Sequence, residues 1–156
     1  MLMRRYISIL ILAFVTIAAF GNDAKKMSNE DRQKWLLEMR NYKHDYISRE
    51  LSLSKDQSNK FFPIYDQMED ELNTIGTQTR DLERKVISDE SANAVECEAA
   101  ARALFEQKKN EGEIELQYFE KFKDILTPRQ LVNLKNVERK FVQQVVNYHG
   151  KSRNRN

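Results

Sequence analysis

Residues 61–86 read FFPIYDQMEDELNTIGTQTRDLERKV, and their apolar side chains recur at alternating intervals of four and three residues. The members of this stripe are Phe61, Tyr65, Met68, Leu72, Ile75, Thr79, Leu82 and Val86. This spacing is typical of a helix that packs against another helix with a left-handed crossing, as in a coiled coil. The segment therefore predicts one long helix of about 33 residues, which reaches about 50 Å at 1.5 Å per residue.

The length of this helix and the composition together indicate the fold class. The chain has 156 residues, with only four Gly and two Pro, too few to supply the tight turns of a many-stranded sheet. A helix of about 50 Å exceeds what a compact four-helix domain of this size needs, so we expect an elongated all-α subunit. Pro63 removes one backbone hydrogen bond inside the helix and is expected to bend its axis.

The rest of the chain predicts three further helices. Residues 29–50 follow a cap at Ser28 or Asn29, and residues 92–126 and about 128–148 form the third and fourth helices, the last ended by Gly150. The first helix carries Trp35, Met39, Tyr42 and Tyr46, and the last carries Leu131, Leu134, Val137, Phe141, Val145 and Tyr148.

The third helix has no single apolar stripe. One candidate stripe contains three charged residues in its middle: Ala101, Leu104, Lys108, Glu111, Glu115, Tyr118, Phe122 and Ile125. A neighbouring stripe consists of Phe105, Gly112, Leu116 and Phe119. We interpret the middle of this helix as thinly packed.

The N-terminus has the layout of a secretory signal. Arg4 and Arg5 precede an almost wholly apolar run over residues 6–20, which is shorter than the roughly 20 residues of a membrane-spanning helix. Ala19 and Gly21 are the small residues that a signal peptidase requires at minus three and minus one, so we predict cleavage after Gly21 and export of the mature chain. The alternative is an uncleaved anchor, which the length of the run disfavours.

Removal of residues 1–21 changes the charge balance. The full chain has 26 basic and 24 acidic residues, and the signal contains two of the basic ones, so the mature chain is neutral with 24 of each. Neutrality and export both argue against nucleic-acid binding. A lone cysteine, Cys97, leaves no internal disulfide, although a disulfide between subunits remains an alternative to a free or packed thiol.

Two short segments repeat the same helix-start motif. The first is Leu53-Ser54-Lys55-Asp56-Gln57 and the second is Leu126-Thr127-Pro128-Arg129-Gln130. In each, the hydroxyl at the cap accepts a bond from the third helical amide, and the glutamine reaches back to the amide of the cap residue. Pro128 occupies the first helical position, where proline is well tolerated. We therefore assign structural roles to Leu53, Ser54, Gln57, Leu126, Thr127 and Gln130.

This pair of motifs, about seventy residues apart in a small exported helical chain, resembles the Spy/CpxP family of periplasmic proteins. The resemblance covers residues 31–148, and Ser54 replaces the family's threonine with another hydroxyl. It implies a four-helix subunit, a curved antiparallel homodimer and ATP-independent binding of unfolded proteins. The family also includes inhibitors of envelope-stress sensor kinases and metal-linked relatives.

The expected organisation is a signal peptide over 1–21, a flexible lead-in over 22–28, one helical domain over 29–149 and a disordered basic tail over 150–156. Basic residues gather late in the chain, which predicts either a positive patch or, more simply, a solvated face. They are Lys135, Arg139, Lys140, Lys151, Arg153 and Arg155.

Neither catalysis nor metal binding finds support in the residues. His44 and His149 lack a glutamate at the spacing used in zincins or di-iron bundles, and no Gly-rich phosphate loop is present. Two His, one Cys and scattered Met give no ligand cluster. We therefore expect neither an enzyme nor a cofactor, and no metal site.

Most aromatic residues are interpreted as core, but not all of them can be buried in one narrow interface between two helices. Phe61 and Phe62 are adjacent and point about 100° apart on a helix, so they cannot both lie in the same helix–helix interface. Candidate client-binding residues are Phe61, Phe62, Tyr65 and Met68.

Together with this resemblance, the sequence predicts a periplasmic, homodimeric, ATP-independent chaperone-like protein that binds unfolded or envelope proteins in the envelope stress response. One alternative is a regulator that binds the periplasmic domain of a sensor kinase, and a weaker one is a heavy-metal sensor. No stable membrane anchor is expected.

Overall fold

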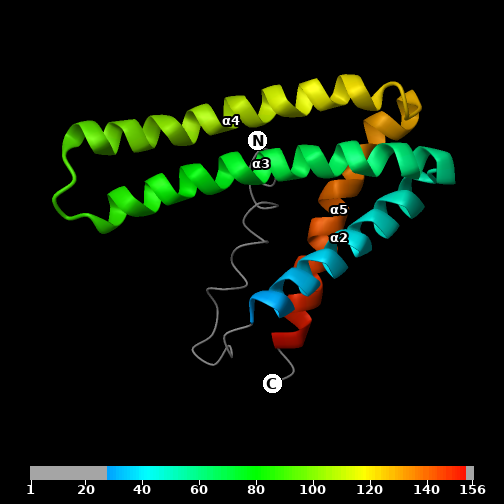
Figure 1. The fold of residues 1–156 in the computed structure, drawn as a ribbon, viewed down its shortest axis with the longest axis horizontal. Coiled ribbons are helices and arrows are strands. Elements are labelled where there is room, and N and C mark those ends of the chain that lie inside the picture. Colours follow the sequence, from blue (N-terminus) through cyan, green and yellow to red (C-terminus); the bar gives the residue numbers. More distant parts are fainter. Residues whose placement is uncertain (1–27, 154–156) are drawn as a thin grey trace. The chain divides into compact units, whose positions relative to one another are not determined.

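The computed structural model describes residues 28–153, with side chains as far as Asn147. Within this range it contains four α-helices and no strand, so the fold class is all-α, as predicted. The helices are α2 (Asn29–Leu51), α3 (Lys55–Ser88), α4 (Ala94–Phe122) and α5 (Pro128–Arg153) (Figure 1). None of them, over the described range, combines the length and apolar character that crossing a bilayer requires. The predicted signal peptide, residues 1–21, lies outside the described residues.

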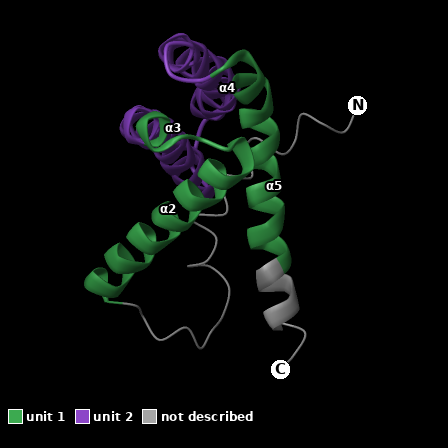
Figure 2. Cartoon of the chain, turned by 90° about the vertical axis from the view of Figure 1, so that its right-hand side faces the viewer, with its two compact units in different colours: residues 1–58, 127–156 green, residues 59–126 purple. Residues whose placement is uncertain are grey.

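The chain divides into two compact units, coloured separately in Figure 2. Unit 1 contains α2, the first turn of α3 and α5, and unit 2 contains residues 59–126. The sequence predicted a single helical domain over 29–149. Two units arise because each pair of helices buries an apolar cluster of its own.

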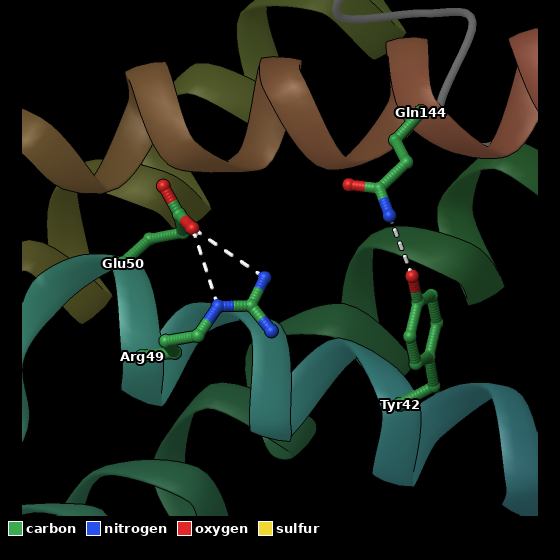
Figure 3. Close-up of polar contacts among 4 residues, drawn as sticks. All are labelled: Tyr42, Arg49, Glu50 and Gln144. Carbon is green, nitrogen blue, oxygen red and sulfur yellow. Dashed lines mark hydrogen bonds and ion pairs between the residues drawn. The ribbon is translucent and has the colours of Figure 1, made fainter.

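Unit 1 is built on the contact between α2 and α5. Its buried apolar side chains are Tyr46, Ile47 and Leu51 from α2, and Leu134, Val137 and Phe141 from α5. The ring of Phe141 lies 5.6 Å from that of Tyr42 and 5.5 Å from that of Tyr46. At the edge of this cluster, Gln144 donates a 2.7 Å hydrogen bond to the hydroxyl of Tyr42 (Figure 3). The burial of Tyr46 raises the pKa of its phenol, and Glu50 raises it further.

Helix α2 begins and ends where its polar residues can satisfy the free backbone groups. Ser28 caps the start by accepting a 3.1 Å bond from the amide of Asp31. At the end, Ser52 has a left-handed backbone with φ of 51°, and its amide donates to the carbonyl of Arg49 while that of Leu53 donates to Ser48. This arrangement closes a helix end but is unfavourable for a residue that has a Cβ.

The two repeated motifs form the predicted capping boxes. The amide of Gln57 donates to the Ser54 hydroxyl, and the Ser54 amide donates to the Gln57 side chain, both at 3.1 Å. In the second box the Gln130 amide donates to the Thr127 hydroxyl at 3.3 Å, and the Thr127 amide donates to the Gln130 side chain at 2.9 Å. The predicted starts of α3 and α5 are therefore confirmed.

The two boxes also contact each other, which the sequence did not predict. The side-chain amide of Gln57 donates to the side-chain oxygen of Gln130 at 2.9 Å. The side-chain amide of Gln130 donates in turn to the backbone carbonyl of Leu51 at 3.2 Å. This carbonyl is one of those left free at the end of α2. Two glutamines thus join three helix ends of unit 1.

Unit 2 is an antiparallel hairpin of α3 and α4, connected by residues 89–93 (Figure 1). An aromatic cluster fills one end of it: the ring of Phe122 lies 4.9 Å from Phe61 and 6.4 Å from both Tyr65 and Tyr118. The Tyr118 hydroxyl donates a 3.1 Å hydrogen bond to Glu71. Burial is the main cause that raises the pKa of Tyr118, and the bond to Glu71 raises it further. Asn93 and Glu96 form a capping box at the start of α4.

Away from the aromatic cluster, the hairpin is thinly packed. In α4, Ala100 is the one buried residue between Ala94 and Asn110, and the next, Glu111, is charged. Glu111 accepts bonds from the side chains of Gln107 and Lys108. The predicted thin packing in the middle of this helix is thus confirmed. The thinly packed region also extends toward the loop that connects α3 and α4.

The predicted stripe of α3 is buried as far as Thr79, with one exception at Ile75. Phe61, Tyr65, Met68, Leu72 and Thr79 are buried, but Gly76 is buried in place of Ile75, and Leu82 is 38% exposed. A strict 3.5-residue repeat drifts by about 20° per heptad on a straight 3.6-residue helix. After three heptads, the residues that follow the repeat no longer face the neighbouring helix.

The predicted limits of two helices were also wrong. Helix α4 spans Ala94–Phe122, shorter at both ends than the expected 92–126, because Asn93 caps its start and a turn ends it before Thr127. Helix α5 continues past Gly150 to Arg153, so the predicted disordered tail over 150–156 does not begin at Gly150. Glycine costs about 1 kcal/mol in a helix relative to alanine but can adopt helical angles.

We expect Ser52→Gly to stabilise the protein by about 0.5–1 kcal/mol, because glycine adopts a positive φ without strain. Thermal unfolding followed by circular dichroism measures the change. The control is Gln78→Gly at an exposed position inside α3, which should lower stability by about 1 kcal/mol. Equal destabilisation by both changes would contradict the left-handed helix end at Ser52.

Thr127→Ala should lower the free energy of unfolding by about 1 kcal/mol, because it removes the hydroxyl that caps α5. Thr74→Ala is the matched control. Its hydroxyl donates to the carbonyl of Asp70 in its own helix, and alanine is the better helix former, so stability should stay equal or rise. An unchanged melting temperature for Thr127→Ala would contradict the capping role.

Candidate functional site

The residues with predicted structural roles lie where helices begin and end. Ser54, Gln57, Thr127 and Gln130 make the two capping boxes of unit 1, while Leu126 is buried at the end of unit 2 and Leu53 is half-buried. Because their polar groups bond to the backbone and to each other, these side chains hold the helices in place.

Three of the four predicted client-binding residues are buried and do not form a binding surface. Phe61, Tyr65 and Met68 are 0%, 1% and 2% exposed, so the prediction is corrected for these three: they are the core of unit 2. Phe62 is half-buried, with its ring 5.2 Å from that of Phe61. The helical spacing located an apolar face correctly, but α4 covers that face.

Large apolar side chains are exposed on all four helices, and three of them gather on the outer face of α4. Phe105 is 79% exposed, Leu116 64% and Phe119 40%. With Gly112 they form the neighbouring stripe that the sequence indicated without assigning it a role. We call Phe105, Gly112, Leu116 and Phe119 the outer stripe. At 100° per residue these four lie within about 60° of one another.

The opposite side of α4 explains why the outer stripe is exposed. Ile114, Tyr118 and Phe122 are buried toward α3, and a helix can bury only one face against a single neighbour. The outer stripe faces away from this core. Beside Phe105 the surface has a shallow depression lined by Glu98, Ala101, Arg102, Phe105, Glu106 and Lys109.

Charged residues surround the outer stripe and pair along the helix. Arg102 lies 3.3 Å from Glu98, Lys109 3.4 Å from Glu113, and Lys123 2.7 Å from Glu120. The contact with Glu120 raises the pKa of Lys123. These pairs are about half exposed or more, so each contributes little to stability.

The neutral charge of the predicted mature chain conceals a strong division between the units. Unit 2 has nine basic and sixteen acidic residues, a net charge of −7. The described part of unit 1 has twelve basic and seven acidic residues, a net charge of +5. In α5 the one acidic residue, Glu138, is buried and lies 3.3 Å from Lys135. The late basic residues as far as Arg153 therefore belong to a cationic helix, and Arg155 lies outside the described residues.

No group of three or more His, Cys, Asp or Glu side chains over the described range is arranged to hold a metal ion. Cys97 is exposed near the start of α4. The acidic residue with a depressed pKa is Asp89, in the connecting loop, where bonds from Ser91 lower it. That contact closes the turn between α3 and α4.

The geometry thus gives a long charged helix with an uncovered apolar stripe, which is the kind of surface that binds another polypeptide. No protein-family model, curated protein or solved structure matches the chain.

Proposed function

We propose that this protein is an exported, ATP-independent chaperone-like protein that captures unfolded or partner proteins on the outer stripe of α4. The observation that carries the proposal is the exposure of Phe105, Leu116 and Phe119 on one helix face. Single exposed apolar residues are ordinary, but several in a row on one face indicate a binding surface.

The residues around the outer stripe suit reversible capture of varied partners. A single helix face offers no deep pocket, so it selects for apolar character and not for shape. Alternating Lys, Arg and Glu beside the stripe can pair with charges of either sign on a client. The resemblance to the Spy/CpxP family supports a periplasmic location and a role in the envelope stress response.

A regulator of a sensor kinase would use the same surface and differ in selectivity. It would bind one receptor domain saturably and leave unrelated unfolded proteins to aggregate. The chaperone-like function is the better supported of the two. The outer stripe has few of the pockets and buried polar groups that specific recognition uses.

The test is an aggregation assay on two unrelated unfolded clients, without ATP and with and without added zinc, nickel or copper. Phe105→Ser should weaken suppression of both by about tenfold, because covering one large apolar side chain is worth about 1.5–3 kcal/mol. The matched control is Val132→Ser on α5, since Val132 is 76% exposed and lies in the other unit.

Suppression of neither client by the unmodified protein would refute the proposed function. Equal loss with Phe105→Ser and Val132→Ser would move the binding surface away from α4. Activity that requires one of the metals would favour the metal-sensor alternative.

A further inference from the structure

Helix α5 has an exposed face on the side opposite its contact with α2. Its buried residues Leu134, Val137 and Phe141 lie on the side that packs against α2. Val132 comes nine residues before Phe141 and therefore points away from this core, at 100° per residue. Val132 and Val146 are both exposed, and they lie about 40° apart around the helix.

Basic side chains surround these two valines. Arg129, Arg139 and Lys140 are exposed and lie within about 80° of Val132 around the helix axis. We call Arg129, Val132, Arg139, Lys140 and Val146 the outward face of α5. No acidic residue of α5 lies on this side of the helix.

The positive charge of the outward face is not balanced within the chain. The acidic residue of α5, Glu138, is buried and lies 3.3 Å from Lys135, so it balances that lysine. Arg129, Arg139 and Lys140 form no ion pair with any residue that the structure describes. Three exposed cations are therefore available to an anion from outside the chain.

The cations of α4 show what a solvated charged face looks like in the same protein. Arg102, Lys109 and Lys123 each lie within 3.4 Å of a glutamate three or four residues away. Solubility requires only polar side chains, and pairs of opposite sign supply them without repulsion along the helix. The outward face of α5 instead gathers charges of one sign.

Two of the basic positions are unfavourable within α5 itself. Arg129 lies in the first turn, which contains no acidic residue, and a cation there opposes the helix dipole. Arg139 follows Lys135 by four residues, a spacing at which like charges repel on a helix. Neither placement stabilises the fold, so an external anionic ligand accounts for them better than solvation does.

We propose that the outward face of α5 binds reversibly to a membrane surface that contains anionic phospholipid. Arg129, Arg139 and Lys140 contact the lipid phosphates, and Val132 and Val146 lie between the headgroups. Clusters of Lys and Arg on an amphipathic helix are typical of such binding. The contact is peripheral, since no segment crosses the bilayer, and it does not rest on the capture of clients by α4.

A lipid surface fits the outward face better than a nucleic acid or an acidic protein does. The two valines lie among the cations, and a chain of phosphates would leave them in water. Between lipid headgroups the same side chains reach the apolar part of the interface. Because two valines bury little apolar area, the binding is mainly electrostatic and therefore reversible.

The test measures how the protein partitions onto vesicles of phosphatidylglycerol mixed with phosphatidylcholine, by cosedimentation at low ionic strength. Vesicles of phosphatidylcholine alone give the background, including any binding through the apolar run over residues 6–20. The anionic lipid should raise the partition constant about a hundredfold, because each of three basic residues contributes about fivefold. About 1 M salt, where the Debye length is about 3 Å, should return it to background.

Charge variants locate the surface that binds the lipid. Arg139→Gln alone should weaken binding about fivefold. Arg129→Gln and Lys140→Gln added to it should remove most of the gain that the anionic lipid gives. Circular dichroism checks that each variant is folded.

The matched control is Arg102→Gln with Lys109→Gln and Lys123→Gln on α4. It changes the net charge as much as the triple variant of α5 does, but it should leave vesicle binding nearly unchanged. Equal losses from the two triple variants would show that net charge is responsible, and not the outward face.

An environment-sensitive dye reports which face touches the bilayer. On Cys97, which is exposed on α4, the dye should keep its emission when anionic vesicles are added. In a chain with Cys97→Ser and Val132→Cys, the same dye lies on the outward face, and its emission should shift to shorter wavelength. An unshifted dye at position 132 would refute contact with the lipid.

The remaining outcomes distinguish the other possible partners. Equal binding to vesicles with and without anionic lipid would overturn the proposal and leave an acidic polypeptide as the partner of this face. Tighter binding to a short duplex DNA at the same phosphate concentration would replace the lipid by a nucleic acid. None of these measurements uses an unfolded client, so this inference and the proposed function fail separately.

Discussion

The hydrogen bond between Gln57 and Gln130 constrains how the helix ends of unit 1 meet. Each glutamine completes the capping box of its own helix, and together they reach the free carbonyl of Leu51 at the end of a third helix. A bond between two half-buried neutral side chains contributes only about 1 kcal/mol. Its importance is geometric, because it fixes the starts of α3 and α5 and the end of α2 against one another.

Local signals predicted the helices well and the contacts between them poorly. Ser54 and Thr127 were identifiable as caps because a capping box involves residues only three positions apart. The pairing of Gln57 with Gln130 spans 73 positions, and nothing in either motif encodes it. The shift from Ile75 to Gly76 in α3 likewise depends on how far a straight helix departs from a 3.5-residue repeat.

The candidate site shows the limit of periodicity as evidence. Spacing can reveal that Phe61, Tyr65 and Met68 share a face, but burial depends on whether another helix covers that face. Aromatic residues at these positions form the core, whereas the poorer stripe of Phe105, Leu116 and Phe119 is exposed. The charged residues in the first candidate stripe of α4 were the signal in the sequence. A helix with two imperfect apolar stripes can bury only one of them against a single neighbour.

The division of charge between the units affects how the protein binds to charged surfaces. A protein without net charge is ordinarily expected not to bind to ion exchangers. Here, however, unit 2 has a net charge of −7 and the described part of unit 1 a net charge of +5. Such a chain behaves as a block polyampholyte. It should be retained by anionic and cationic resins alike near its isoelectric point, and dissolved salt should release it from both.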